Sequence, residues 1–359
     1  MKNIFKILAV VVLATMLSTE SAWAGNDNRR GTAGASELLI NPWAGSAGWG
    51  GVNIANTRGL ESFFTNIAGL TYVSKTELAY HNTMWLGGKS GLNSGASINA
   101  FGIAQRVSDR GVLGLYVMAM GFGDIDVTTV NSPEPGFNGT YSPSYLNINL
   151  AYAHAFSQSI RGGAAIKVIS ESVSDVSATG FAIDAGIQYV TGADDELKFG
   201  ISMKNIGSTM SFNGPGLSLT MINDAGNSFT VETRDAKMEL PTCLNIGLSY
   251  DFLMAEGDHR LTLAGSFTSN AFLKDNFTVG LEYGLFDIMQ IRAGYVFQRG
   301  IFKDYTAGRT AANTGLCAGA TFKIPLSKKD DSKCIKLEYA YRTAYPLKGT
   351  HTIGGSINL

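Results

Sequence analysis

Histidine and serine are the residue types in this sequence that could carry nucleophilic chemistry. The chain contains four histidines, and a hydrolase would use one of them as the base that activates a serine. The sequence has no GxSxG motif and no ordered Ser/His/Asp set. His154 falls on the outward face of an alternating segment, where a ring at a membrane boundary is the simpler interpretation. A membrane-embedded acyl hydrolase would be the enzyme hypothesis for this chain. Because the motif and the ordered set are both missing, a protein without enzymatic activity is favoured.

A glycine-rich run could serve a second kind of chemistry, the binding of a phosphate. It reads Ala44-Gly45-Ser46-Ala47-Gly48-Trp49-Gly50-Gly51. A phosphate loop follows a strand of a βαβ unit and ends in GKS or GKT, and this run has neither feature. The glycines are better explained by close packing of the backbone against a neighbouring element.

Cysteine is the remaining candidate for a metal or redox site. The three cysteines, Cys243, Cys317 and Cys334, have no CxxC or Cys/His spacing. An odd number cannot all pair within the chain. A Cys317–Cys334 disulfide stays open, although the strands predicted below place these two residues out of register. We therefore expect packing residues, and neither a metal nor a cofactor.

Composition narrows the class of protein. The 359 residues are 45% apolar and only 16% charged, with 43 glycines and a formal net charge of −1. This charge balance offers nothing to attract nucleic acid. After the amino terminus, no stretch approaches the roughly 18 to 20 apolar residues of a spanning helix, which excludes a helical membrane bundle.

The amino terminus has the features of an export signal. Lys2 and Lys6 flank the start, Ile7 to Leu17 is an apolar core, and Ala22-Trp23-Ala24 is a small-x-small cleavage site. We expect residues 1–24 to be a signal peptide and 25–36 to be an N-terminal periplasmic segment.

Side chains in the mature chain alternate with a period of two, which predicts strands. In Leu146 to Phe156, large residues occupy one face, while asparagine and alanine occupy the other. Such segments run ten residues or more, whereas ordinary strands average about 5 to 6 and a strand crossing a bilayer needs about 9 to 11. The fourteen expected strands are 75–86, 94–107, 112–127, 144–157, 161–172, 178–190, 196–208, 240–252, 259–270, 275–284, 288–298, 312–326, 333–342 and 349–359.

Connections between these strands indicate the topology. Every second connection is short, while the interleaved set includes the long segments 128–143, 209–239 and 299–311. Short periplasmic turns that alternate with longer outer loops are typical of an outer-membrane barrel with both termini in the periplasm. The sequence thus predicts an all-β fold, a 14-stranded antiparallel transmembrane β-barrel over 75–359 in the outer membrane of a Gram-negative bacterium.

Charged residues on the inward parity of the strands would be costly against lipid, so we expect them in the lumen. These lumen charges are Lys167, Asp184, Lys204, Glu282, Arg292, Lys336, Glu338 and Arg342. Inward glycines such as Gly186, Gly280 and Gly294 leave room beside the wall. The segment 37–74, which does not alternate, is expected to fill that room as a plug or hatch. Its candidate residues are Gly45, Gly48, Trp49, Gly50, Gly51, Asn66, Gly69 and Leu70.

Several short motifs in residues 31–90 resemble a known family. They are Gly31-Thr32-Ala33-Gly34-Ala35, the Ala/Gly-rich stretch through Gly51-Val52, Asn66-Ile67-Ala68-Gly69-Leu70, and Thr76 to Leu86. These motifs resemble the start of the PorV/PorQ family of Bacteroidetes-type bacteria, whose members are fourteen-stranded barrels similar to the fatty-acid transporter FadL. The resemblance implies a role in type IX protein secretion. The implied partners, besides outer-membrane lipid, are secreted cargo bound through its carboxyl-terminal signal domain, the translocon barrel and an attachment complex.

Two functions follow from these expectations. A secretion accessory needs a surface that grips a protein, and the 209–239 connector offers apolar residues that would be costly without a cover. Its candidate residues are Phe212, Leu217, Leu219, Met221 and Phe229. A FadL-like transporter of hydrophobic small molecules would need an apolar pocket behind the plug instead. Secretion is the main expectation from the resemblance, and transport is the alternative.

Overall fold

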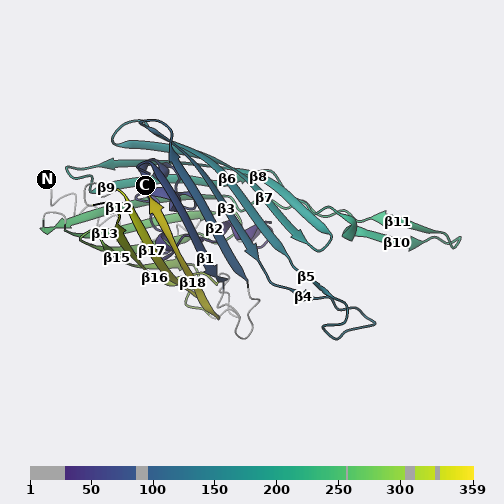
Figure 1. The fold of residues 1–359 in the computed structure, drawn as a ribbon. Helices are drawn as coiled ribbons and strands as arrows, with labels where there is room; N and C mark the ends of the chain where they lie inside the picture. Colours follow the sequence, from purple (N-terminus) through teal and green to yellow (C-terminus); the bar gives the residue numbers. More distant parts are fainter. Residues whose placement is uncertain (1–28, 86–95, 256–257, 304–311, 328–331) are drawn as a thin grey trace.

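A closed antiparallel barrel of fourteen strands makes up most of the protein (Figure 1). The computed structural model describes residues 29–85, 96–255, 258–303, 312–327 and 332–359. The barrel strands are β1 (Thr76–Met84), β2 (Ser97–Arg106), β3 (Gly111–Gly121), β6 (Ser144–Ala155), β7 (Ile160–Val173), β8 (Val176–Thr191), β9 (Leu197–Gly207), β12 (Cys243–Met254), β13 (His259–Asn270), β14 (Asn276–Leu285), β15 (Met289–Gln298), β16 (Gly315–Pro325), β17 (Cys334–Ala344) and β18 (Leu347–Asn358). β1 pairs with β18 and closes the sheet, so the predicted fold class is confirmed.

Alternation along the strands separates an inner face from an outer face. In β8, Asp184 and Gln188 are buried, while Phe181 is 57% exposed and Ile187 is 58% exposed. A closed barrel satisfies its backbone hydrogen bonds between strands, so its outer face can carry an apolar band against hydrocarbon. The long alternating segments of the sequence are explained by this requirement.

One predicted strand is too long. The expected segment 112–127 ends as β3 at Gly121, and Gly123 has a φ of +79°. The apolar alternation that continued through Ile125 belongs to β4 (Ile125–Asp126), which pairs with β5 (Thr140–Tyr141) in a loop outside the barrel.

The two ends of the barrel differ in their connections. At one end, here called the short-turn end, strands are joined by segments such as 107–110, 156–159 and 286–288. The other end, here called the long-loop end, carries 122–143 and 208–242. The latter contains two strands that the sequence did not indicate, β10 (Ser218–Ile222) and β11 (Ser228–Glu232), after a short 3-10 turn η6 (Pro215–Leu217). No strand was predicted in the 209–239 connector, so this pair is a difference from the sequence-based expectation.

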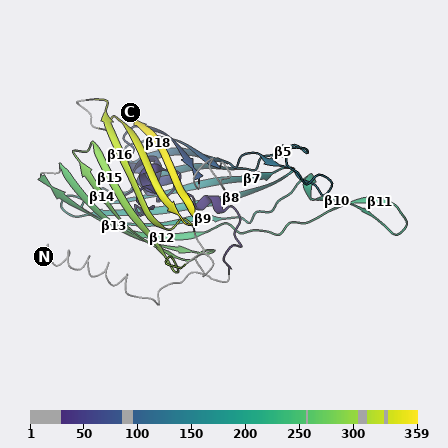
Figure 2. The same cartoon turned by 90° about the horizontal axis from the view of Figure 1, so that it is seen from below.

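Residues 36–73 lie inside the barrel and form four short helical turns (Figure 2). These are η2 (Ser36–Leu39), α2 (Ala44–Ala47), η3 (Gly59–Phe63) and η4 (Ile67–Tyr72). η4 contacts β3, β6, β7 and β8, η3 contacts β1 to β3, and α2 contacts β16 to β18. The segment, here called the inner segment, therefore touches the wall on several sides.

The ends of the described chain lie at opposite ends of the barrel. Arg29 forms an ion pair with Glu239 and stacks over Phe272, both at the long-loop end. Leu359 instead exchanges backbone hydrogen bonds with Thr76 at the short-turn end. For residues 29–36, this arrangement corrects the expectation that 25–36 lies on the same side as the carboxyl terminus. A parallel bridge between Ala33 and Glu239 joins this part of the chain to the base of the long connector.

No helix within the described ranges has the length and the apolar character that crossing a membrane requires. The expected signal peptide, 1–24, lies outside the described residues, as do 25–28 and part of the 299–311 connector.

Candidate functional site: two lumen cavities divided by the inner segment

The inner segment divides the described lumen into two cavities of different character. The first, here called the polar cavity, has a volume of about 320 Å³ and lies toward the short-turn end, where Asp251, Asp287 and Asn358 line it. The second, here called the apolar cavity, has a volume of about 420 Å³ and lies toward the long-loop end, where Asn270 and Gln298 line it. Both volumes suit a small organic molecule, for which sites measure roughly 300 to 1,000 Å³.

Wall glycines let the inner segment approach closely. A Cβ atom on Gly294 would lie 2.4 Å from the carbonyl oxygen of Trp49, and one on Gly280 would lie 2.6 Å from Val52 Cγ1. On the inner segment, a Cβ atom on Gly48 would lie 2.8 Å from the Cα atom of Gly319. The inward glycines predicted from the sequence thus lie where the backbone of the inner segment meets the wall.

Gly294→Ala is therefore expected to destabilise the protein by about 1 to 3 kcal/mol, because Trp49 backbone must move to admit the methyl group. Gly284→Ala on the adjacent strand is the matched control, since the nearest atom to its Cβ would be 3.8 Å away. The stability of both variants is measured by unfolding in urea, with the loss of heat-modifiable migration on a gel as the readout. Equal losses in the two variants would contradict the packing explanation.

Polar bonds add to this packing on the β8–β9 side. The Asn66 side-chain amide donates to the backbone oxygen of Ile187 at 3.0 Å, and Ser202 Oγ donates to the oxygen of Thr65 at 2.8 Å. The predicted residue Asn66 thus joins the inner segment to the wall. Gly69 packs against the inner segment itself, where its Cβ would lie 2.5 Å from the oxygen of Thr57, and Leu70 is fully buried.

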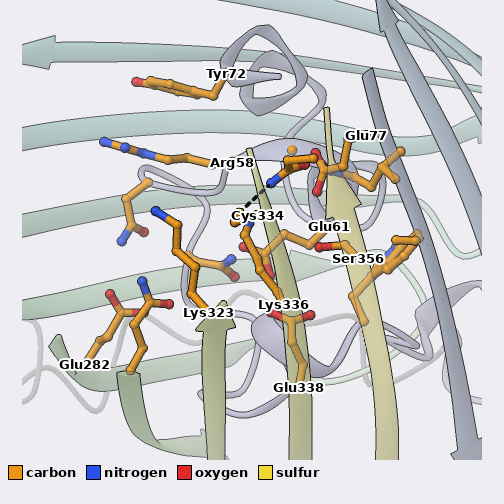
Figure 3. A pocket seen from close by; sticks show the side chains of 18 of the residues that line it. Arg58, Glu61, Tyr72, Glu77, Glu282, Lys323, Cys334, Lys336, Glu338 and Ser356 are labelled. Carbon is orange, nitrogen blue, oxygen red and sulfur yellow. Dashed lines mark hydrogen bonds between the residues drawn. The ribbon is translucent and has the colours of Figure 1, made fainter. Parts of the chain in front are cut away.

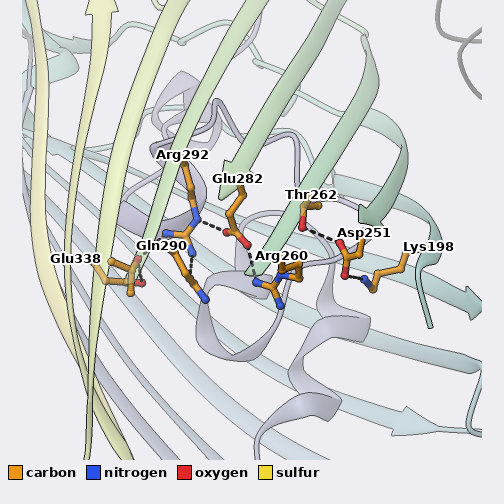
Figure 4. Close-up of polar contacts among 9 residues, drawn as sticks. Lys198, Asp251, Arg260, Thr262, Glu282, Gln290, Arg292 and Glu338 are labelled. Atoms are coloured by element: carbon orange, nitrogen blue, oxygen red, sulfur yellow. Dashed lines mark hydrogen bonds and ion pairs between the residues drawn. The ribbon is translucent and has the colours of Figure 1, made fainter. Parts of the chain in front are cut away.

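The polar cavity is lined by charged side chains from both the wall and the inner segment (Figure 3). Glu282 on β14 accepts from Arg260 at 2.7 Å and from Arg292 at 2.6 Å, while Lys198 pairs with Asp251 (Figure 4). Breaking one buried pair of this kind leaves an uncompensated charge and costs about 3 to 5 kcal/mol. The network thus fixes the positions of the charges on the wall around the inner segment.

Glu61 is the carboxyl group that the inner segment contributes to this cavity. A Cβ atom on Gly45 would lie 2.7 Å from Glu61 Oε2 and 3.0 Å from Glu338 Oε1, so the two carboxyl groups meet at this glycine. Burial, followed by the charge of Glu338, raises the pKa of Glu61 to about 8. The charges of Arg292 and Lys336 act in the opposite direction, and Glu282 adds to the rise. Glu61 is therefore protonated at neutral pH.

The stability of the protein should fall as the pH rises from about 4.5 to about 8. The unfolded chain releases the Glu61 proton near its ordinary pKa of 4.5, while the folded chain holds it until about 8. Each pH unit in this window thus removes about 1.4 kcal/mol. Glu61→Gln should remove this contribution, measured as thermal unfolding at pH 5 and pH 8.

Glu134→Gln is the control for that experiment, because Glu134 is an exposed carboxyl group of the 122–143 connector. It should leave the pH dependence of the wild type in place. The other titratable groups are the same in all variants, so the difference between variants isolates Glu61. A Glu61→Gln profile that parallels the wild type would contradict the assignment.

The apolar cavity combines a hydrocarbon lining with two cationic groups. Its apolar side chains include Ile40, Ile54, Phe64, Trp85, Met120, Phe122 and Val296. Lys204 enters from β9 and Arg342 from β17. Glu37 lies at the lining as the single carboxylate among the described residues there.

Two donor atoms of the Arg342 guanidinium lack hydrogen-bond partners in the described part of the chain. Its Nε and Nη2 atoms are buried and make no hydrogen bond to a described residue, while its guanidinium carbon lies 5.9 Å from the Trp85 ring centre. The Lys204 ammonium lies 3.7 Å from the centre of the Phe64 ring, which attracts a cation weakly. A buried guanidinium with free donors is suited to an anionic group of a ligand.

The eight predicted lumen charges all have inward parity in the structure. Glu282, Arg292, Lys336 and Glu338 line the polar cavity, and Lys204 and Arg342 line the apolar cavity. Lys167 and Asp184 lie in neither and form an ion pair at 2.6 Å instead. That pair adjoins a β-bulge, where Asn205 has a φ of +60° and donates its backbone N–H to Asp184.

Sequence reasoning missed the residues that make each cavity specific. Glu61 was overlooked, although it is the one charged residue of the apolar stretch Leu60 to Phe64. The buried His81 was also missed as a contact of the inner segment, where its Nδ1 accepts from the backbone N–H of Ala44 at 3.2 Å. Alternation in 75–86 could have placed His81 on the inner face of its strand, but not against Ala44. No such pattern covers Glu61, whose position is set by tertiary packing.

The five predicted partner residues lie in two different environments in the structure. Leu219, Met221 and Phe229 lie on β10 and β11 and are exposed. Phe212 instead packs against the hydrophobic core at the base of the connector, and Leu217 is half-buried in η6. The last two therefore contribute to holding the connector rather than to a free surface.

The histidines and cysteines do not form a reactive set. The Nδ1 of His81 is occupied by the Ala44 N–H, and its Nε2 faces Glu338, whereas His154 stacks on Tyr152 outside the barrel. Cys243, Cys317 and Cys334 are buried and free, and the register places Cys317 opposite Arg342 and Cys334 opposite Pro325. The described residues contain no His/Cys/Asp/Glu group able to hold a metal ion.

A closed fourteen-stranded barrel with a segment folded inside it has the FadL-like fold of outer-membrane hydrocarbon channels. The chain is similar to the CymD monoaromatic hydrocarbon channel, with a TM-score of 0.58 and 14% identity over 89% of this chain and 98% of that chain. It is also similar to the Pseudomonas putida toluene transporter TodX (TM-score 0.54, 10% identity, 89% and 97% covered). A Pseudomonas aeruginosa FadL homologue gives a TM-score of 0.52 with 11% identity, covering 88% of this chain and 98% of that chain. No family model and no curated protein sequence matches the chain. At these identities the likeness establishes the fold.

Proposed function

We propose that this protein is an outer-membrane conduit for small hydrophobic molecules that carry an anionic group. The observation that carries the proposal is the apolar cavity, which places the Arg342 guanidinium, with two unpaired donor atoms, among aromatic and aliphatic side chains. The hydrocarbon body of a ligand would replace water against the apolar lining. The head group would accept hydrogen bonds from Arg342.

The inner segment is proposed to act as the plug that the sequence suggested. Its residues line both cavities from opposite sides, with Gly50 and Gly51 toward the apolar cavity and Trp49 and Glu61 toward the polar one. A ligand would therefore have to displace part of this segment to pass from one cavity to the other. The structural relatives support the proposal, because they are described as channels for monoaromatic hydrocarbons and a toluene transporter.

Uptake of 4-ethylbenzenesulfonate tests this function, because the sulfonate keeps its charge and does not cross lipid unaided. Vesicles that contain the full-length protein should take up the probe faster than empty vesicles, and should not take up glucose. Because Cys317 lies opposite Arg342 in the sheet, the probe should also slow reaction of this thiol with N-ethylmaleimide. A Cys243→Ser/Cys334→Ser variant leaves Cys317 as the only thiol. Uptake equal to that of empty vesicles would reject the conduit.

A role in type IX secretion is the second candidate, favoured by the protruding connector 208–242. The resemblance of residues 31–90 to PorV/PorQ proteins implies it, together with cargo, translocon and attachment-complex partners. Replacing 217–233 by a Gly/Ser turn in a host that secretes by this route should leave an inserted barrel but retain cargo in the periplasm, because surface loops contribute little to barrel closure. Normal secretion would count against this candidate, and sulfonate uptake should be unchanged in either case.

A further inference from the structure

The connector 208–242 forms a two-stranded arm that projects from the long-loop end (Figure 1). β10 and β11 pair over Ser218–Ile222 and Ser228–Glu232, and all ten residues are exposed. The base of the arm is anchored, because Met210 is buried against Gly180 and pairs with Met238. The arm is therefore joined to the barrel through a packed and hydrogen-bonded base.

The register divides the arm into an apolar face and a polar face. Leu219 lies opposite Val231 and Met221 lies opposite Phe229, and side chains two apart in a strand share a face. These four residues are 57%, 36%, 50% and 46% exposed, respectively. The other face carries Ser218, Thr220, Thr230 and Glu232, together with Ile222 and Ser228. An isolated hairpin is at best marginally stable in water, and an uncovered apolar face indicates a partner.

The edges of the arm are also open to a further strand. β10 and β11 form a sheet of their own, and none of the described residues pairs with their outer edges. Soluble sheets protect such edges with lysine, proline or a bulge. Neither strand contains lysine or proline, and their pairing has no bulge. An unprotected edge beside an apolar face is suited to the addition of a strand from another chain.

Charge around the arm indicates the chemistry of that chain. The connectors 122–143, 174–175 and 208–242 contain eight carboxylates and two basic residues, Arg234 and Lys237. The carboxylates are Asp124, Asp126, Glu134, Asp175, Asp224, Glu232, Asp235 and Glu239. Arg29 pairs with Glu239, and the remaining seven carboxylates still outnumber the two basic residues of these connectors. Such a surface attracts basic groups and disfavours a second acidic surface, including a second copy of the same arm.

We propose that the β10–β11 arm binds an extended segment of a partner protein as an added strand. The segment has apolar residues at alternate positions, which cover Leu219, Met221, Phe229 and Val231, and basic residues at its flanks. This proposal goes beyond the conduit and does not depend on it, because the arm is separate from both cavities.

A synthetic peptide in which threonine and valine alternate between two pairs of lysines is the probe. It is labelled with a fluorophore and titrated against full-length protein in nanodiscs, with anisotropy as the readout. We expect it to bind at least about tenfold more tightly than a scrambled peptide or a peptide with glutamate flanks, a difference of about 1.4 kcal/mol. Equal binding of the scrambled peptide would overturn the added strand, and absence of binding by all three would overturn the site.

Matched variants on the two faces separate the proposed contact from general effects. Leu219→Ser/Phe229→Ser should weaken binding of the alternating peptide about tenfold, whereas Thr220→Ser/Thr230→Ser on the polar face should not. Equal loss in both variants, or no loss in either, would overturn the assigned face. Self-association of the protein that is lost in the first variant would assign the face to a second copy and overturn the proposal.

Charge reversal should change the affinities for the two flanked peptides in opposite directions, which unfolding of the hairpin would not do. Asp224→Lys/Glu232→Lys should weaken the lysine-flanked peptide and strengthen the glutamate-flanked one. An unchanged order of affinities would overturn the charge argument. Sulfonate uptake is measured in the same preparations, so that failure of the arm is distinguished from failure of the conduit.

Discussion

Deletion of residues 36–73 is expected to convert a closed barrel into an open pore. The inner segment contacts strands on several sides of the lumen, and its removal leaves the inter-strand ladder of fourteen strands intact. Barrels of 8 strands are filled by side chains and those of 16 to 18 enclose a water channel, so an emptied barrel of this size should conduct. Single-channel current in a planar bilayer should rise on the order of tenfold or more over the wild type.

The control for this deletion is the replacement of 217–233 by a Gly/Ser turn. That change removes an exposed hairpin from the long-loop end but leaves the lumen lining unchanged. Both proteins must first migrate as folded, heat-modifiable barrels. If the variant without 36–73 is folded but conducts no better than the wild type, the inner segment is not the barrier.

The barrel could be predicted from the sequence because each wall strand has one inner and one outer face. Expected and observed strands coincide for β13 and differ by three residues or fewer at both ends for twelve others. The exception is β3, which ends at Gly121, two residues before Gly123 takes a positive φ, although apolar residues continue beyond it. Local alternation reports on the two faces of a strand, but it cannot tell the wall from a short pair such as β4–β5 in a loop.

The position of the inner segment could be inferred, but not its contacts. Inward glycines such as Gly280 and Gly294 indicate a close neighbour, because only that neighbour explains the absence of a side chain. Which residue fills each space depends on how 36–73 folds, and a sequence without regular periodicity does not specify this. The meeting of Glu61 with Glu338 at Gly45 is therefore evident only in three dimensions.

For the charged residues of the lumen, the sequence likewise predicts the face of the strand but not the contacting residue. Parity placed Arg292 and Arg342 inside the barrel, and both are inside. Their environments are opposite, because Arg292 bonds Glu282 and Thr321 whereas Arg342 has buried donors without a partner in the described chain. The partner is decided by residues on neighbouring strands, and these depend on the register. Arg342, the arginine with two unpaired donor atoms, is the one we assign to a ligand.

Arg342→Leu is expected to abolish the preference of the apolar cavity for an anionic ligand. In the wild type, 4-ethylbenzenesulfonate should bind about 10- to 100-fold more tightly than ethylbenzene, because hydrogen bonds to a charged group contribute about 1.5 to 3 kcal/mol. The variant keeps the hydrocarbon lining and adds an apolar side chain, so it should bind ethylbenzene at least as well. Equilibrium binding to protein in nanodiscs measures both ligands.

Lys204→Leu and Lys323→Leu define how specific this effect is. Lys204 lines the same cavity, but its ammonium already contacts the Phe64 ring, so its loss should reduce the preference by a smaller factor than the loss of Arg342. Lys323 lies in the polar cavity and pairs with Asp287 at 2.5 Å. Its replacement should leave both affinities unchanged, because the inner segment stands between it and the ligand. An equal loss of sulfonate binding in all three variants would mean that the net charge of the lumen attracts the anion, and Arg342 would then not be the group that binds it.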